Sequence, residues 1–378
     1  MHSCPLEGQR RGSSPVVLFA ILLIPMLGML AFSIDIGYMT LVKTDIHTAA
    51  DAAALAGAQK LQKRYVQYNL PAQTSKNAIL AAATTNTPGS PMATAEHYAK
   101  LNKAGNVSIS VPDQDVSFGF TDAQGTFSAN YGAQNGGFPN SITVVTRRDK
   151  KANTPVSLFF GPVFGFISKD LEAMATATIY SGDVTSLRVI QGVKGHLLPF
   201  ALDVNYWRQF CANGTSPDGT IHTAANGYPE IQIFPCPANT PGSSGQTPND
   251  ISYLLNNSLL PVAMGSPKQW PLQGSVASGT GVPSLMPLFI PASAPAGMQA
   301  LAPGTTYQAA SGTGNNATYA IVGFVGVCIS EAGGAGISVQ PRAVLDPTAV
   351  IPNPKPVGTQ TSQFGTIITT FISAKLTR

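Results

Sequence analysis

Apolar residues are distributed unevenly along the chain, and the longest uninterrupted apolar run lies near the N-terminus. Residues 15–34 read PVVLFAILLIPMLGMLAFSI and contain no charged side chain. An α-helix needs about 20 such residues to cross a hydrocarbon core near 30 Å thick. The run predicts a transmembrane helix over residues 13–34 rather than a cleaved signal peptide, whose apolar core usually spans about 7–15 residues and ends at a small-residue site.

The charges beside this run predict its orientation in the membrane. Arg10 and Arg11 precede the run and Asp35 follows it. Because excess positive charge stays in the cytoplasm, residues 1–12 are expected to form a basic cytoplasmic N-terminus and everything after the span to lie outside the cytoplasm. An aspartate at the centre of a membrane helix costs about 2.5–3.5 kcal/mol, so Asp35 is expected to mark the outer boundary.

The helical pattern continues beyond the membrane. Between residues 40 and 65 the chain is rich in alanine and lacks proline, and apolar or small residues recur near helical spacing. We expect one continuous helix from residue 14 to residue 69, about 80 Å long at 1.5 Å per residue, with residues 35–70 as its extramembrane part. The positions expected to share its apolar face are Val42, Ile46, Ala49, Ala53, Leu61 and Tyr65.

Small residues form a stripe on this extramembrane part. Ala49, Ala53 and Gly57 follow one another at intervals of four residues, so they lie on one face of a helix. A stripe of small side chains lets a second backbone approach closely. The approaching element is either a helix of a partner protein or the globular part of this same chain, and the pattern leaves both alternatives open.

The next segment, residues 71–187, is expected to be a small α+β unit beside the helix. Residues 107–120 and 141–147 alternate apolar and polar side chains, which is the period of β-strands. The apolar run LFFGPVFGFI, residues 158–167, is too short for a second span and is interrupted by glycine and proline. We therefore expect this run to be buried in the core of the unit.

Beyond residue 188 the pattern changes to short apolar clusters separated by Gly, Pro and Asn. Clusters of β-branched and aromatic residues occupy positions 228–235, 319–329 and 365–376. Short strands separated by these turn-forming residues favour a β-rich, sandwich-like domain over residues 188–378. The fold class expected for the whole chain is therefore α+β.

Composition narrows the classes of function. Of the 378 residues, 44% are hydrophobic and only 11% are charged, and the net charge of +4 is spread along the chain. No cluster of Lys and Arg with interleaved aromatic residues is present, so we expect no nucleic-acid partner.

Cys211 and Cys236 bracket a loop of about 25 residues, and a disulfide between them would contribute roughly 3 kcal/mol. Free buried thiols are the open alternative.

Catalytic and metal-binding chemistry finds little support in the sequence. The five histidines are scattered, and no motif for a metalloprotease, a nucleophilic serine or a phosphate-binding loop occurs. We expect no enzyme activity, cofactor or metal. His47 and Asp51, four residues apart on the helix, are interpreted as a surface pair. Asp203, near Tyr206 and Trp207, fits a structural corner of the β-rich domain better than a carbohydrate site.

The N-terminal motifs together resemble those of the TadE/TadG-like proteins of the bacterial tight-adherence (Flp-type) pilus system. The residues that carry the resemblance are Arg11-Gly12, the apolar span, Ile34-Asp35-Ile36-Gly37 and the run Ala49-Ala50-Asp51-Ala52-Ala53-Ala54-Leu55-Ala56-Gly57-Ala58. A strand at 142–145, the element Pro155–Gly161 and the stretch 172–178 follow in the order seen in this family. The resemblance is good over residues 10–180 and weaker over 188–378.

The resemblance implies an accessory or minor pilin-like component of pilus assembly, with Gly12, Asp35, Gly37, Ala49, Asp51, Ala53 and Gly57 as its motif residues. Cleavage after Gly12 would place Val17 at the fifth position, where pilin precursors carry Glu, which disfavours a major pilin. Implied partners are membrane lipid of the bacterial inner membrane and other pilus-assembly membrane proteins, met through the N-terminal helix. The alternative is an anchored envelope protein whose C-terminal β-domain binds glycan, peptidoglycan or another surface ligand.

Overall fold

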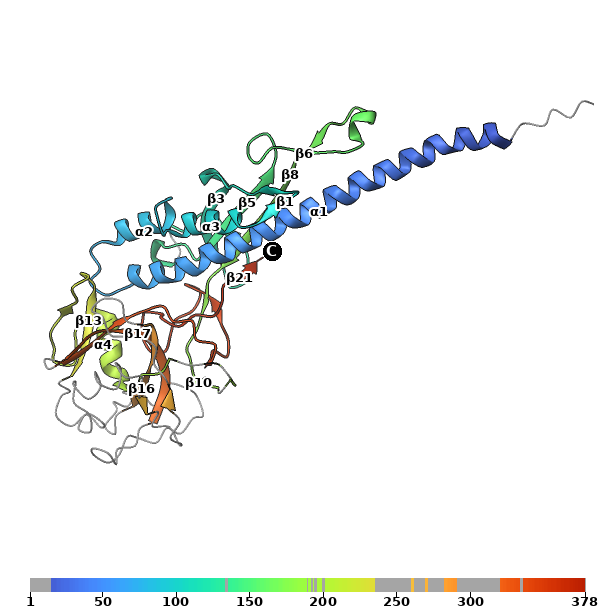
Figure 1. Ribbon diagram of the computed structural model, residues 1–378. Helices are drawn as coiled ribbons and strands as arrows, with labels where there is room; N and C mark the ends of the chain where they lie inside the picture. Colours follow the sequence, from blue (N-terminus) through green and yellow to red (C-terminus); the bar gives the residue numbers. More distant parts are fainter. Residues whose placement is uncertain are drawn as a thin grey trace, which may run out of the picture.

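A computed structural model gives the fold of the protein and describes residues 15–132, 135–188, 201–234, 282–290, 320–333 and 336–377, with short pieces at 190–191, 193, 196–198, 260–261 and 269–270. A long helix extends away from a body of short helices and β-sheets (Figure 1). The expected fold class is confirmed: the chain is α+β, with a long apolar N-terminal helix and a β-rich C-terminal region.

Four α-helices and three short 3-10 helices are present among the described residues. The α-helices are α1 (Pro15–Tyr68), α2 (Lys76–Thr84), α3 (Pro91–Lys100) and α4 (Val204–Asn213), and the 3-10 helices are η1 (Asp113–Asp115), η2 (Asn135–Gly137) and η3 (Gly161–Phe164). Helix α1 agrees with the continuous helix expected from residue 14 to residue 69. Ser90 caps α3 by accepting the N–H of Ala93, and Pro91 occupies its first turn, where a missing N–H costs nothing.

The N-terminal half of the body is built on a five-stranded antiparallel sheet with the order β21-β8-β5-β3-β4. Its strands are β3 (Val116–Thr121), β4 (Phe127–Ser128), β5 (Ser141–Arg148), β8 (Leu171–Thr178) and β21 (Lys375–Thr377). Two-stranded ladders nearby are β1 (Lys103–Ala104) with β2 (Val107–Ser108) and β6 (Val156–Ser157) with β7 (Ser168–Lys169). The predicted strand over 107–120 is thus split by η1.

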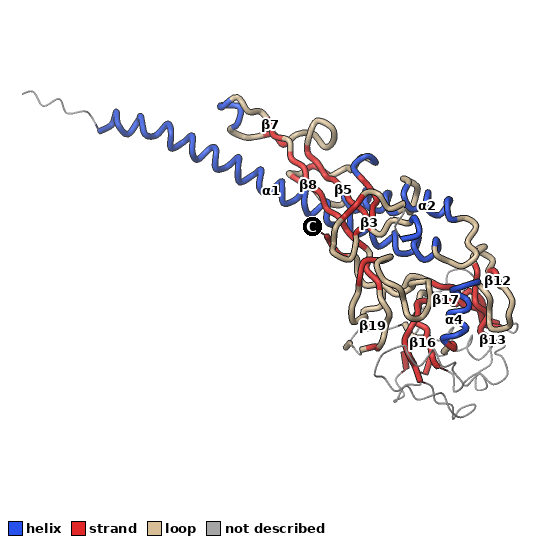
Figure 2. Tube along the Cα trace, turned by 180° about the vertical axis from the view of Figure 1, so that it is seen from behind, coloured by secondary structure: helices blue, strands red, loops and turns tan. Residues whose placement is uncertain are grey.

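Helix α1 packs across this sheet with the face that the sequence pattern predicted. Val42, Ile46, Ala49, Ala53 and Leu61 are fully buried and Tyr65 nearly so. Alternate residues of β8, the alanines at 173, 175 and 177, are buried on the side of the sheet that α1 covers (Figure 2). Helix α3 also packs against α1 (Figure 1). Small residues on both surfaces let helix and sheet approach closely.

The C-terminal region contains a six-stranded sheet with the order β11-β16-β17-β18-β13-β12, in which only the β11–β16 pair is parallel. Its strands are β11 (Leu202–Asp203), β12 (His222–Thr223), β13 (Pro229–Phe234), β16 (Ser284–Ile290), β17 (Ala320–Gly333) and β18 (Gly336–Pro341). Helix α4 buries Trp207 and Phe210 beside it. The smaller ladders of this region are β10 (Ser186–Leu187) with β19 (Ala349–Val350) and β14 (Leu260–Pro261) with β15 (Gln269–Trp270).

The end of the chain returns to the N-terminal sheet. Strand β21 pairs with β8, and β20 (Lys355–Pro356) pairs with β9 (Tyr180–Ser181). The buried Asn140 side chain donates to the Val357 carbonyl at 2.8 Å, and Gln62 of α1 donates to the Ile372 carbonyl at 3.1 Å. The last residues of the segment 188–378 therefore complete a sheet whose other strands all lie within residues 71–187.

One expectation about the core is wrong. Residues 158–167, expected to be buried, form the tip of the β6–β7 hairpin, and most of their large side chains are exposed, Val163 by 81%. The hairpin leaves the sheet and projects in the same direction as the N-terminal half of α1 (Figure 1). The described part of the protein therefore provides no core that buries these apolar residues.

Candidate functional site

The N-terminal half of α1 has an apolar surface that the rest of the described chain leaves uncovered. Its exposed large side chains are Leu18, Phe19, Ile21, Leu22, Leu23, Ile24, Met26, Leu27, Met29, Leu30, Phe32 and Ile34. Among the described residues, α1 is the one helix long and apolar enough to cross a membrane. Exposed apolar area of this extent is the signature of a surface made for lipid or for another apolar partner.

Asp35, at the end of the apolar run, binds the neighbouring hairpin. Its carboxylate accepts the backbone N–H of Phe159 at 2.7 Å and that of Phe160 at 3.0 Å. The side chain is buried, with 5% of the residue exposed, although it follows the most exposed part of the helix. A carboxylate that accepts two N–H groups in this way is held by charge-assisted hydrogen bonds, so Asp35 fixes the hairpin to α1.

Two further residues of α1 strengthen this junction, and sequence reasoning did not single them out. The ring of Tyr38 meets the ring of Phe159 edge-on, with centroids 5.1 Å apart. The ammonium group of Lys43 donates to the backbone carbonyl of Glu172 at the start of β8. Helical spacing could have indicated Tyr38, which lies three residues after Asp35, but not Lys43, which lies about 80° from Asp35 around the helix.

The small-residue stripe lies against the chain's own body. Ala49 and Ala53 are fully buried. At Gly57 an added Cβ would lie 2.7 Å from Cδ1 of Ile142 and 3.3 Å from Cβ of Ala95. Of the two alternatives left open by the sequence, the structure therefore favours packing within the chain, since β5 and α3 already occupy the space that a partner helix would need.

The remaining motif residues are dispersed. Gly37 is exposed, and a Cβ added there would meet nothing within 4 Å. Asp51 and His47 line an open cleft of about 950 Å³ together with Thr143 and Met174, and no ion pair between them is present among the described residues. Gly12 lies outside the described residues, so its role as a motif residue stays a prediction.

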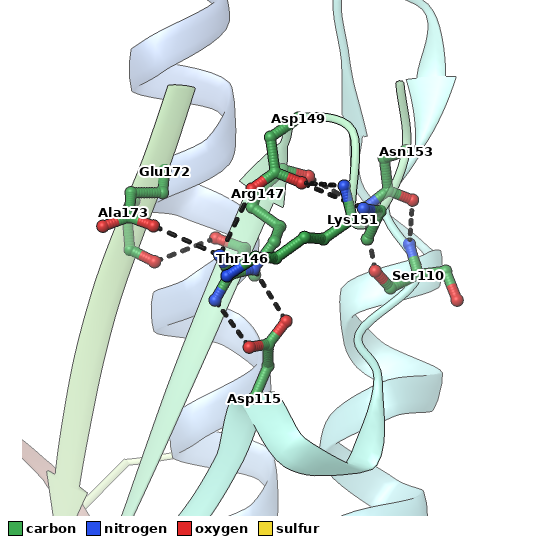
Figure 3. Close-up of polar contacts among 10 residues, drawn as sticks. Ser110, Asp115, Thr146, Arg147, Asp149, Lys151, Asn153, Glu172 and Ala173 are labelled. Carbon is green, nitrogen blue, oxygen red and sulfur yellow. Dashed lines mark hydrogen bonds and ion pairs between the residues drawn. The ribbon is translucent and has the colours of Figure 1, made fainter. Parts of the chain in front are cut away.

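An ionic cluster stabilises the end of the sheet from which the hairpin leaves (Figure 3). The guanidinium of Arg147 donates to both oxygens of Asp115, at 2.8 and 2.5 Å, and to Asp149 at 3.2 Å. The bond to Asp115 raises the pKa of Arg147. Burial opposes ionisation of Asp149, but N–H groups of residues 152 and 151 and the guanidinium together lower its pKa. The single guanidinium thus joins β5 to η1 and to the turn that follows β5, which is a structural arrangement.

Comparison with known proteins identifies the part of the chain that carries these features. Residues 13–60 match the family model described as Flp pilus-assembly TadE/G-like, and residues 43–177 match the model described as Tad-like Flp pilus-assembly. Residues 13–177, called the Tad module below, therefore match models of TadE/TadG-like Flp pilus-assembly proteins and make up less than half of the chain. No curated protein and no solved structure matches the chain. The resemblance inferred from the N-terminal motifs is confirmed.

The two family matches follow the physical organisation of the Tad module. The first covers the exposed half of α1 and most of its buried half, and the second begins at Lys43 and ends at Ala177 within β8. Together they include the Asp35 junction, the β6–β7 hairpin and the Arg147 cluster. The strands of the six-stranded sheet all lie beyond the Tad module.

Neither inside nor outside the Tad module do the described residues form a group of three or more His, Cys, Asp or Glu side chains that could hold a metal ion. Trp207 is fully buried, which agrees with a structural corner near Asp203 and provides no exposed ring for a sugar. Burial raises the pKa of the Cys211 thiol to about 12. Cys236 lies outside the described residues, so the Cys211–Cys236 disulfide stays a prediction, which peptide mapping without reductant would check.

Proposed function

We propose that the protein is a single-pass, membrane-anchored accessory or minor pilin-like component of Flp pilus assembly, with a structural role and no catalysis. Its N-terminus lies in the cytoplasm, α1 crosses the bacterial inner membrane, and the body lies in the periplasm or beyond. The family matches support a role related to Flp pilus assembly. The arginines before the span and Asp35 after it support the orientation.

One observation carries this proposal: the single helix α1 has two halves with opposite surroundings. Residues 18–34 carry large apolar side chains that are exposed. The other half of α1 is buried and presents small residues to the sheet and to α3. An apolar rod continuous with the core of a folded body is suited to holding that body at a membrane surface. Because no flexible linker separates the two halves of α1, the helix also fixes the position of the body relative to the membrane.

The same contrast between the two halves of α1 indicates which surface partner proteins would contact. Because the stripe at Ala49, Ala53 and Gly57 is buried, other pilus-assembly membrane proteins would meet the exposed apolar face of residues 18–34 instead. Within a bilayer, helices associate through van der Waals packing and interhelical hydrogen bonds rather than through the hydrophobic effect. Ser33 donates to the carbonyl of Met29 in its own helix, so packing is the main contribution available here.

Site-specific photo-crosslinking in a bacterium that assembles the pilus tests this proposal. A photoreactive phenylalanine analogue at Phe32 should crosslink to a membrane protein of the pilus machinery. The same analogue at Ile221, which is exposed in the C-terminal region, is the matched control. Recovery of intact protein in the soluble fraction, or crosslinks from Phe32 to no pilus-assembly protein, would contradict the proposal.

The alternative function, glycan or peptidoglycan binding by the C-terminal region, lacks a favourable observation among the described residues. Stacking on a sugar requires an exposed aromatic ring. Of the two candidate rings, Trp207 has no exposed surface and Tyr206 is partly buried against the core. The assembly role is therefore the function that the described geometry supports best.

A further inference from the structure

The tip of the β6–β7 hairpin has the composition of a membrane-contacting element. Its large apolar side chains are exposed to different extents, from 39% at Phe160 to 81% at Val163. No charged residue occurs between Lys151 and Lys169. The exposed side chains of the tip are Phe159, Phe160, Val163, Phe164, Phe166 and Ile167.

Several backbone N–H groups of the tip are hydrogen-bonded within the protein. The N–H of Leu158 donates to the carbonyl of Ile167 at 3.1 Å, and that of Phe166 donates to Gly161 at 2.9 Å. Pro162 has no N–H, and the N–H groups of Phe159 and Phe160 are bound by Asp35. Lipid-exposed irregular backbone does not occur deep in the hydrocarbon core, so a tip of this kind is suited to the boundary between headgroups and acyl chains. The bonds made by its N–H groups lower the cost of moving it out of water.

The position of the tip along α1 is fixed by contacts on both sides of the expected boundary. An added Cβ at Gly28 would lie 3.8 Å from Cζ of Phe164, so this ring packs at the bare backbone of the glycine, within the apolar run. Gly28 precedes Asp35 by seven residues, which is about 10 Å along a helix. The Asp35 and Tyr38 contacts hold the first residues of the tip, Phe159 and Phe160, against the helix.

We propose that residues 158–167 form a second membrane-embedded element, which enters the outer leaflet beside α1 and contacts lipid hydrocarbon. This inference rests on the proposed anchoring of α1 in a bilayer. The occupant is lipid because the exposed apolar surface of the tip is continuous with that of the span and lies at the same depth. The hairpin and helix together then fix the rotation and depth of the body relative to the membrane, which a lone helix leaves free.

Quenching of an introduced tryptophan by brominated lipid tests the insertion in the full-length protein reconstituted into phospholipid vesicles. Phe164→Trp places the reporter at the tip, Phe32→Trp places it on the span, and Ile221→Trp places it on the exposed surface of the body. Trp207 and Trp270 provide the background signal, which the wild type measures. Lipids brominated near the headgroup end of the acyl chain or near its terminal methyl report the depth.

Insertion predicts that the added emission of Phe164→Trp is lost to a similar extent as that of Phe32→Trp, more strongly with the shallow bromine, while the emission of Ile221→Trp is unchanged. Quenching of Phe32→Trp without quenching of Phe164→Trp would overturn the insertion and leave the anchoring intact. Quenching of neither would overturn both. A Phe164→Cys variant that forms disulfide-linked dimers, in vesicles where Phe164→Trp is not quenched, would assign the tip to a second copy of the chain instead.

Discussion

Both halves of α1 present an apolar surface, but the two surfaces consist of residues of different size. In residues 18–34 the exposed large side chains are Leu, Ile, Phe and Met, whereas the buried face between Val42 and Tyr65 includes five Ala and one Gly. The half with the larger apolar side chains is the half that no described part of the protein covers. Apolar residues are therefore not a sufficient sign of a protein core, because a bilayer can cover them instead.

The contrast has a simple origin in packing. A sheet and a second helix can approach α1 closely only where the side chains between them are small, so the covered half is rich in alanine. Lipid chains are fluid and adapt to any shape, so the uncovered half gains most from large side chains, at about 25 cal/mol per Å² of apolar surface removed from water. The predictions below test this contrast, beginning with the largest effect.

The same leucine-to-alanine change should have different consequences in the two halves. Leu61→Ala removes a fully buried side chain and should lower the free energy of unfolding by about 3 kcal/mol, since a cavity adds to the lost burial. Leu27→Ala, in the uncovered half, should change it by less than about 0.5 kcal/mol. Denaturant unfolding of the detergent-solubilised protein measures both. Equal losses in the two variants would break the comparison.

Removal of the Asp35 carboxylate should release the hairpin from the helix. Asp35→Ala leaves two N–H groups without their charged acceptor and should lower the local opening free energy by about 2 kcal/mol. Hydrogen exchange at the amides of Phe159 and Phe160 should accelerate accordingly. Asp45→Ala is the matched control, because Asp45 accepts a single long bond of 3.4 Å from Gly105. Unchanged exchange in Asp35→Ala would show that the junction is held by other contacts.

Two glycines of the family motif should respond to alanine with opposite signs. Gly57→Ala forces a methyl group against Ile142 and Ala95 and should cost about 1–2 kcal/mol of stability. Gly37→Ala meets open space and should gain up to about 1 kcal/mol through helix propensity. Thermal unfolding of the two variants beside the wild type measures the difference. A stabilising Gly57→Ala would mean that α3 can move away from α1.

The ionic cluster at the end of the sheet should add a small dependence of stability on pH. Because the folded-state pKa of Asp149 is lowered, its contribution is present above its ordinary pKa near 3.8 and is lost as the pH falls through the folded value. The stability difference between wild type and Asp149→Asn, expected to be below about 1 kcal/mol at neutral pH, should therefore shrink on acidification. A difference that grows below pH 4 would reverse the assigned sign.

Residues 158–167 show where sequence reasoning failed. The run LFFGPVFGFI was expected to be buried because it is too short to span a membrane and is interrupted by glycine and proline. The alternative of an apolar tip held beside the span requires knowledge that Asp35 binds Phe159 and that Phe164 lies at Gly28, contacts between residues more than a hundred positions apart. Local pattern contains no information about such pairings.

The sequence by itself determined the continuous helix, its apolar span and its buried face, the strands β5, β13 and β17, and the family. These features depend on periodicity and on short-range spacing, which are local properties of the chain. Only the tertiary structure decided that the small-residue stripe faces the chain's own α3 and sheet, that β21 completes the sheet of residues 71–187, and that the aromatic hairpin lies exposed beside the span. The physical reason is that the side chain of an apolar or small residue determines only that its burial is favourable. The long-range arrangement of the chain determines which surface buries it.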